Sequence, residues 1–150
     1  MPNRHLYLQT ATASQYVGQI IEHQLGRLGI APTLIALLTH IGEHEPISPS
    51  ELSRVAGMPT TTLRDNVQRL VDRNLVRRVS NPDDGRSYLV RRTARGRTLL
   101  DAADPALLEA YRALERRLPR PREEYERMFA ELNDALEATF GSLVGDVSLH

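Results

Sequence analysis

The sequence predicts a mainly α-helical protein with one small β-hairpin, and three observations carry this prediction. Most of the 150 residues fall into stretches in which apolar residues recur at helical spacing. Residues 48–55 and 60–73 have the pattern of two short helices joined by a glycine turn, as in a helix-turn-helix. Two short stretches of strand character, 75–79 and 87–91, then flank a turn rich in Asn, Pro, Asp and Gly. A hairpin directly after a helix-turn-helix predicts a winged helix-turn-helix.

The composition restricts the function classes. The absence of cysteine excludes a disulfide framework, a thiolate metal site and a thiol redox switch. Because the sequence has neither an apolar run of about 18 residues nor a basic-then-apolar leader, we expect a cytoplasmic protein. It contains no Gly-rich phosphate loop and no nucleophile elbow, and its carboxylates are scattered over predicted helix surfaces. These features predict a protein that is not an enzyme and that has no cofactor.

Charge is distributed unevenly along a chain whose formal net charge is +0. Residues 54–97 hold eleven arginines and four aspartates, a surplus of seven positive charges, and the remainder holds eight arginines and fifteen acids. A basic centre between acidic arms is the electrostatic pattern of a single nucleic-acid-binding module. The charge pattern therefore favours double-stranded DNA as a partner despite the neutral total.

The terminal regions are predicted as long amphipathic helices over residues 6–28, 93–118 and 122–141. The helices at the two ends have no partner nearby in sequence, so the simplest way to bury their apolar stripes is against each other and against a second chain. We expect an obligate homodimer in which residues 1–30 and 105–150 form the dimerisation region. Residues 31–104 would form the DNA-binding region of the same intertwined domain.

Strong boundary signals surround the central helices. Ser48 and Glu51 form a capping box with Pro49 in the first turn, and a mostly apolar helix over residues 33–43 precedes them. Asn74 stands where a left-handed residue ends the second helix of the pair. The N-terminus of that helix carries Thr60, Thr61 and Thr62, whose hydroxyls suit phosphates and whose methyl groups suit thymine.

The order of elements and the wing residues resemble the MarR (multiple antibiotic resistance regulator) family of transcriptional regulators over nearly the whole chain. The resemblance is sharpest in residues 81–87 and 93–96, Asn-Pro-Asp-Asp-Gly-Arg-Ser and Thr-Ala-Arg-Gly. Asp84 and Arg86 match the Asp-x-Arg of the family's wing tip. Thr93 and Gly96 match its Leu-Thr-x-x-Gly, with Arg92 in the place of the usual leucine.

This resemblance implies a homodimer that binds palindromic DNA, usually as a repressor, and is released by a small, often phenolic or lipophilic, effector. Arg86 would enter the minor groove, Asp84 would anchor the wing, and residues 60–69 would be the recognition helix. Arg64 and Asp65 depart from the residues common in relatives, so the operator sequence is not transferable. The residues expected at the DNA are Ser50, Thr60, Thr61, Thr62, Arg64, Asp65, Gln68, Arg69, Arg77, Asp84 and Arg86.

Family analogy and helix phase also suggest an effector site between the dimerisation helices and the winged module. The candidates are Tyr16, His23, Arg27, His40 and Tyr111, although each also fits a core tyrosine or a surface charge. Two alternatives stay open. His40 and His44 have the spacing of paired metal ligands and would serve a metal-responsive regulator, although further ligands are missing. A winged helix can also bind protein instead of DNA.

Overall fold

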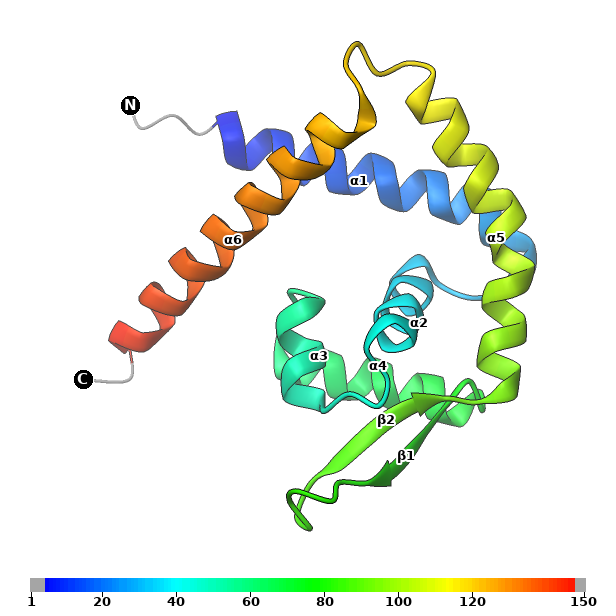
Figure 1. Cartoon of the computed structure of the whole chain (residues 1–150), viewed down its shortest axis with the longest axis vertical. Coiled ribbons are helices and arrows are strands. Elements are labelled where there is room, and N and C mark those ends of the chain that lie inside the picture. The colour runs from blue at the N-terminus through cyan, green and yellow to red at the C-terminus, as the bar shows by residue number, and fades with distance from the viewer. Residues whose placement is uncertain (1–4, 148–150) are drawn as a thin grey trace. The chain divides into compact units, whose positions relative to one another are not determined.

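The computed structural model describes residues 5–147 (Figure 1). The elements are α1 (His5–Leu25), a 3-10 turn η1 (Gly26–Leu28), α2 (Pro32–His44), α3 (Pro49–Val55), α4 (Thr60–Asp72), β1 (Val76–Ser80), β2 (Tyr88–Arg92), α5 (Ala94–Glu115) and α6 (Arg122–Val147). The chain divides into two compact units, Met1–Ala110 and Tyr111–His150. The mainly helical fold with a winged helix-turn-helix is therefore confirmed, and the functional division of the chain stays a prediction.

In the first unit α2 lies at the centre of the core, as its nearly unbroken apolar sequence predicts. Five of its side chains are buried, and α1, α3, α4 and strand β2 pack around them (Figure 1). Burying this much apolar surface is the main force that holds the module together. The core contributed by the other elements comprises Leu25, Ile30, Ile47, Leu52, Leu63, Val67, Leu70, Leu75, Val76, Val90, Leu100 and Ala103.

The predicted helix boundaries at the centre of the chain are confirmed. Ser48 Oγ accepts from the Glu51 amide at 3.2 Å, and the Glu51 carboxylate accepts from the Ser48 amide at 3.2 Å, which completes the capping box. Asn74 has φ 55°. Its amide donates to the Val71 carbonyl and that of Leu75 to the Leu70 carbonyl, so α4 ends in a Schellman motif.

Several predicted boundaries were wrong. The strands begin and end one residue later than expected, because the Leu75 amide is used to close α4 and is not available to start β1. Helix α5 ends at Glu115 and not at residue 118, because Leu118 precedes Pro119 and is disfavoured in helical geometry. After Glu115, the amides of Arg117 and Leu118 donate to the carbonyls three residues earlier, so the chain forms turns there and not a further α-helical turn. Helix α6 runs six residues beyond the expected end.

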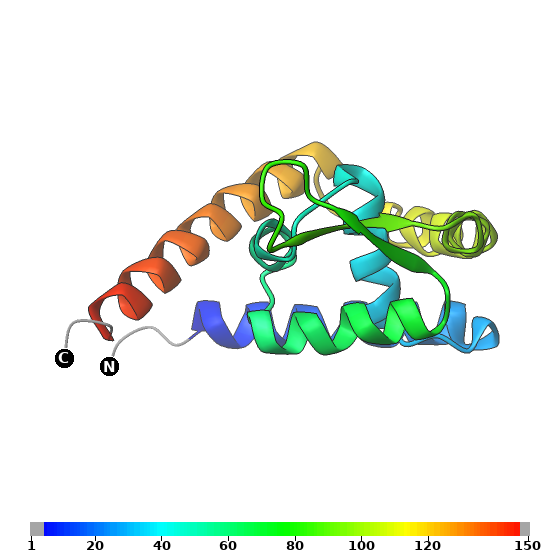
Figure 2. The same cartoon turned by 90° about the horizontal axis from the view of Figure 1, so that it is seen from below.

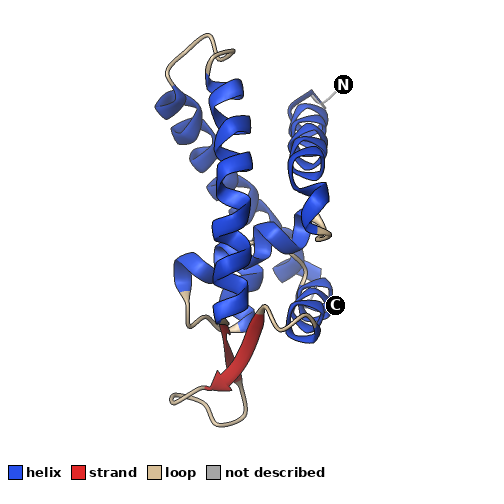
Figure 3. Ribbon diagram, turned by 90° about the vertical axis from the view of Figure 1, so that its right-hand side faces the viewer, coloured by secondary structure: helices blue, strands red, loops and turns tan. Residues whose placement is uncertain are grey.

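The hairpin is attached to the helical core as well as to itself. Strands β1 and β2 pair antiparallel with Arg78 opposite Val90, and Ile47 forms a further bridge to Val90 from the α2–α3 connection. Figure 3 shows the turn of the hairpin projecting from the helices of the first unit. By length and composition no single described helix could span a membrane; only His5–Leu28 and Pro32–His44 taken together pass such a test, across a bend of 89°.

Candidate nucleic-acid interface

Helix α4 separates its inner and outer faces sharply. Leu63, Val67 and Leu70 are buried, whereas the outward positions carry exposed Thr, Arg and Asp side chains. Figure 2 shows this helix along its length at the surface of the module. The exposed positions include the predicted contact residues Thr60, Thr61, Thr62, Arg64, Asp65 and Arg69. The guanidinium groups of Arg64 and Arg69 form no hydrogen bond or ion pair within residues 5–147.

The turn between α3 and α4 is fixed by polar contacts that the sequence did not reveal. Asn66 is only 7% exposed on the inner side of α4, and its amide nitrogen donates to the Met58 sulfur at 3.3 Å. Ser53 Oγ donates to the Met58 carbonyl at 2.6 Å and lies 3.5 Å from Thr60 Oγ1. These contacts hold the first turn of α4 against α3, so the threonines at that end have a defined position.

Gln68, predicted as a base-contacting residue, is already engaged inside the module. Its amide nitrogen donates to Asp72 Oδ1 at 2.7 Å, and its amide oxygen accepts from Arg78 Nη2 at 2.7 Å. Arg78 lies over the ring of Tyr88, 4.7 Å from its centroid. Gln68 therefore connects α4 to the hairpin, and a contact from it to a base would have to share or replace these partners.

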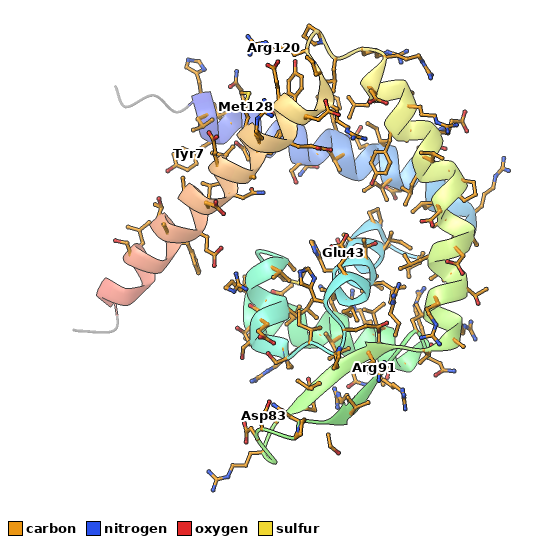
Figure 4. All side chains as sticks on the ribbon, in the orientation of Figure 1. Tyr7, Glu43, Asp83, Arg91, Arg120 and Met128 are labelled. Atoms are coloured by element: carbon orange, nitrogen blue, oxygen red, sulfur yellow. The ribbon has the colours of Figure 1, made fainter. Side chains whose placement is uncertain are left out.

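The tip of the wing is organised by Asp84. Its Oδ1 accepts from the Arg86 amide at 2.9 Å, and its carbonyl accepts from the amide of Ser87 at 3.0 Å. Asn81 Oδ1 accepts from the Asp83 amide at 3.0 Å, and its amide nitrogen donates to Ser87 Oγ at 2.7 Å. The exposed guanidinium of Arg86 forms no hydrogen bond or ion pair with any residue that the structure describes. Figure 4 labels Asp83 in this turn.

The base of the wing holds an ion pair that sequence reasoning missed. Arg92 Nη2 lies 3.2 Å from Glu45 Oε1, and the other carboxylate oxygen accepts from the Arg92 amide at 2.6 Å. Burial of the Glu45 carboxyl acts to raise its pKa, but the amide and the guanidinium of Arg92 outweigh that effect, so the pKa lies below its ordinary value. Arg92 also donates to the Gly42 carbonyl at 3.3 Å. Arg92 thus ties β2 to the α2–α3 connection, and it does not pair with an acid of α5.

Thr93 and Gly96, matched to the family motif by resemblance, have a clear physical role. Thr93 Oγ1 accepts from the Gly96 amide at 3.0 Å and donates to the Asn74 carbonyl at 2.7 Å. A Cβ atom on Gly96 would collide with the Leu75 carbonyl oxygen. The close approach of α5 to the end of α4 therefore requires glycine at this position.

The remaining predicted residues occupy separate places. Ser50 on α3 and Arg77 on β1 are exposed. His44 Nδ1 lies 3.0 Å from the His40 carbonyl, and His40 Nδ1 lies 3.9 Å from Glu43. Within residues 5–147 no three His, Asp or Glu side chains are grouped as metal ligands, so His40 and His44 gain no further ligand there. The assignments of single residues to DNA or effector contacts stay predictions.

Comparison with known proteins places this module in a family. The sequence profile of the MarR family matches residues 28–87, from the last residue of η1 to the wing turn. This part of the chain is therefore similar to the MarR family. The chain is also similar to the HTH-type transcriptional repressor NicR of Pseudomonas putida, with 37% identity over 68 residues. That alignment spans 45% of this chain and 43% of the length of NicR.

Solved structures extend the likeness of this chain beyond the winged module. A probable transcriptional regulator from Pseudomonas aeruginosa is 29% identical, with a TM-score of 0.74 over 88% of this chain and 99% of its own. The DNA complex of the transcriptional regulator MosR from M. tuberculosis is 26% identical, with a TM-score of 0.77 over 88% and 96%. MarR-family proteins are DNA-binding transcriptional regulators and not enzymes, which agrees with the predicted function class.

Proposed function

We propose that this protein is a member of the MarR family and a homodimeric, sequence-specific DNA-binding regulator, a repressor of a palindromic operator that a small effector releases. The observation that carries the proposal is the set of exposed guanidinium groups on the outer face of α4 and at the wing tip, where Arg64, Arg69 and Arg86 form no hydrogen bond or ion pair with any described residue. Cations held apart from acidic partners are available to phosphates and to base edges. The MosR complex with DNA shows that a protein of this fold binds DNA through some of its surface.

Exposed apolar side chains support the homodimer. Helix α6 has no buried side chain between Arg122 and Leu143, although Phe129, Phe140 and Leu143 are 49%, 66% and 64% exposed. Helix α1 likewise exposes Tyr16 and other large apolar residues; Figure 4 labels Tyr7 on α1 and Met128 on α6. Apolar surface of this extent marks an interface in a stable protein.

DNA binding is tested by titrating a labelled duplex from the promoter of the protein's own gene and following fluorescence anisotropy. Because several arginines per half-site would displace counterions, affinity should fall by roughly a thousandfold or more between 50 and 200 mM salt. Arg86→Ala should weaken binding by roughly 10- to 100-fold if its guanidinium lies in a narrow minor groove. The control Arg120→Ala removes an exposed arginine outside the module and should leave affinity unchanged. A salt-insensitive affinity, or equal effects of the two variants, would refute the proposal.

The homodimer is tested separately by light scattering during gel filtration. Phe140→Glu places a charge on the apolar stripe of α6 and should convert the protein to a monomer, because burying an unpaired charge opposes association. Ala138→Glu adds the same charge on the opposite side of the helix and should leave a dimer. A wild-type protein that elutes as a monomer, or two variants with the same mass, would contradict a dimer built on this stripe.

A further inference from the structure

The outermost stripe of α4 carries an acidic side chain near its centre. At about 100° per residue, four exposed residues lie on the side of the helix opposite its buried side chains: Thr61, Asp65, Gln68 and Asp72. We propose that Asp65 recognises a cytosine in the major groove of the operator, by accepting a hydrogen bond from the cytosine N4 amino group. The inference rests on the proposed function, because it concerns the same surface.

The neighbouring polar groups of this stripe are already bonded within the protein. Gln68 donates to Asp72 Oδ1 and accepts from Arg78 Nη2, each at 2.7 Å. Asp65 is exposed and forms no hydrogen bond or ion pair with any residue that the structure describes. The carboxylate of Asp65 is therefore the acidic group of the stripe that is available to a donor outside the protein.

The arginines beside Asp65 do not neutralise it within the described chain. Arg69 stands four residues after Asp65, a spacing that permits an ion pair on a helix, yet the two side chains do not pair. Arg64 and Arg69 project from the two flanks of the stripe. A helix in the major groove presents its outermost stripe to the base edges and its flanks to the phosphate backbones. Asp65 would then face bases, and the two guanidinium groups would face phosphates.

The chemistry of the base edges selects the partner of a carboxylate. A carboxylate only accepts hydrogen bonds, and phosphate oxygens, guanine N7 and O6, and thymine O4 are all acceptors that repel it. Adenine offers its N6 donor, but the acceptor N7 lies beside that donor. Cytosine presents the N4 donor without an acceptor on its own major-groove edge. Cytosine is therefore the base that suits Asp65 best.

An acidic residue at this position acts on specificity more than on affinity. Its charge opposes the approach of phosphates at every DNA sequence, and only a donor placed opposite it compensates for that repulsion and for the lost hydration. Asp65→Ala should therefore bind DNA of unrelated sequence more tightly than the wild-type protein does. The gain should be at least about twofold at low salt, where charge repulsion is least screened.

Base preference is measured by selecting binding sites for the full chain from a library of random duplexes and sequencing them. The wild-type protein should enrich a cytosine at one position of each half-site. Asp65→Asn keeps the shape of the side chain, and its amide can bond adenine N6 and N7 together. In this variant the same position should change from cytosine to adenine, while the other enriched positions stay as they are.

Two controls carry the same substitution at other aspartates. Asp72→Asn removes a charge from the same stripe where the carboxylate is held by Gln68, and Asp101→Asn removes an exposed charge from α5. Both should keep the cytosine. If Asp65→Asn keeps it too, the inference is overturned. If Asp65→Asn instead relaxes a preference for guanine, Asp65 only orients an arginine, and the inference is equally wrong.

A modified base tests the hydrogen bond itself. N4-methylcytosine at the selected position keeps the base pair but replaces the outward hydrogen of N4 by a methyl group. By fluorescence anisotropy, this change should weaken binding of the wild-type protein at least about tenfold and that of Asp65→Ala less than about twofold. Equal losses in the two proteins would overturn the inference.

The selection separates this inference from the proposed function. If the wild-type protein enriches no sequence, the proposed function fails and the inference fails with it. If the protein enriches a site in which no position depends on Asp65, the proposed function stands and the inference alone is wrong.

Discussion

At the base of the wing, the half-buried guanidinium of Arg92 donates to Glu45 and to the Gly42 carbonyl, whereas at the tip Arg86 is exposed and only its backbone amide is bonded. Both arginines lie on the same hairpin and have the same side chain, so residue type does not separate them. The surroundings of the two side chains separate them. A cation that the fold has already paired stabilises the hairpin, and a cation that the fold leaves unpaired is available to a ligand.

The largest difference between base and tip is expected for glycine. Gly96→Ala at the base would press a Cβ atom onto the Leu75 carbonyl oxygen and should lower the free energy of unfolding by about 3 kcal/mol. Gly85→Ala at the tip meets no atom within 4 Å and should change it by less than about 0.5 kcal/mol. Urea unfolding followed by circular dichroism measures both. Equal losses would mean that the base is not the rigid part of the wing.

The two arginines give the next largest contrast. Arg92→Ala should cost about 2 kcal/mol of unfolding free energy, because it leaves the largely buried Glu45 carboxylate without its charged donor. Arg86→Ala should cost less than about 0.5 kcal/mol in the same urea experiment, since its side chain has no partner within the described chain. A loss of stability in Arg86→Ala comparable to that in Arg92→Ala would remove the distinction between structural and ligand-directed arginines.

The ion pair at the base also predicts a dependence on pH. Because the folded pKa of Glu45 lies below the ordinary value of 4.5, its stabilisation is fully present above about pH 4.5 and is lost as pH falls through the folded pKa. Glu45→Gln should therefore be less stable than wild type by about 1–2 kcal/mol at neutral pH, with the gap closing on acidification. Urea unfolding of both proteins across this range measures the gap.

A double-variant comparison isolates the cause of that pH dependence. In an Arg92→Ala background, Glu45→Gln should change the pH profile of stability less than in the native background, because the guanidinium no longer lowers the Glu45 pKa and only the amide of residue 92 still donates to the carboxylate. A gap that stays constant with pH in the native background, or that persists unchanged without Arg92, would show that Glu45 acts through packing and not through its charge.

What the sequence predicted correctly is mostly local. The Ser48–Glu51 capping box, the left-handed Asn74 and the Asp84 turn each depend on residues within five positions of one another, so their geometry follows from spacing. The Arg92–Glu45 pair joins residues 47 positions apart, and neither residue has a pattern that identifies the other. The sequence placed Arg92 in the family's Leu-Thr-x-x-Gly motif but did not reveal its contact with Glu45.

The same limit applies to a pocket of about 360 Å³ in the first unit. Its arginines belong to the end of α4 and the start of α5, and its floor belongs to the α1–α2 connection and the β1 approach. The family analogy directed attention to other side chains, such as Tyr16 and His40. Only the packing of three separate segments brings Arg73 and Arg95 to one pocket, so no spacing rule could have selected them.

Arg78 lies between the two ends of the wing, and the effect predicted for it on the free energy of unfolding is the smallest. It contacts both Tyr88 and Gln68, so it belongs to the framework, yet it is exposed and adjacent to α4. A double-mutant cycle of Arg78→Ala with Gln68→Ala should show a coupling of about 0.5 kcal/mol in unfolding free energy. Arg77 is the neighbouring exposed arginine on β1. A double-mutant cycle of Arg77→Ala with Gln68→Ala should show no coupling. If the two cycles give the same coupling, the exposed middle of the hairpin resembles the tip, and the framework of the wing ends at Arg92. If only the Arg78 cycle shows coupling, the framework reaches α4 through Gln68. That contact would then limit how freely the Gln68 side chain could contact a base.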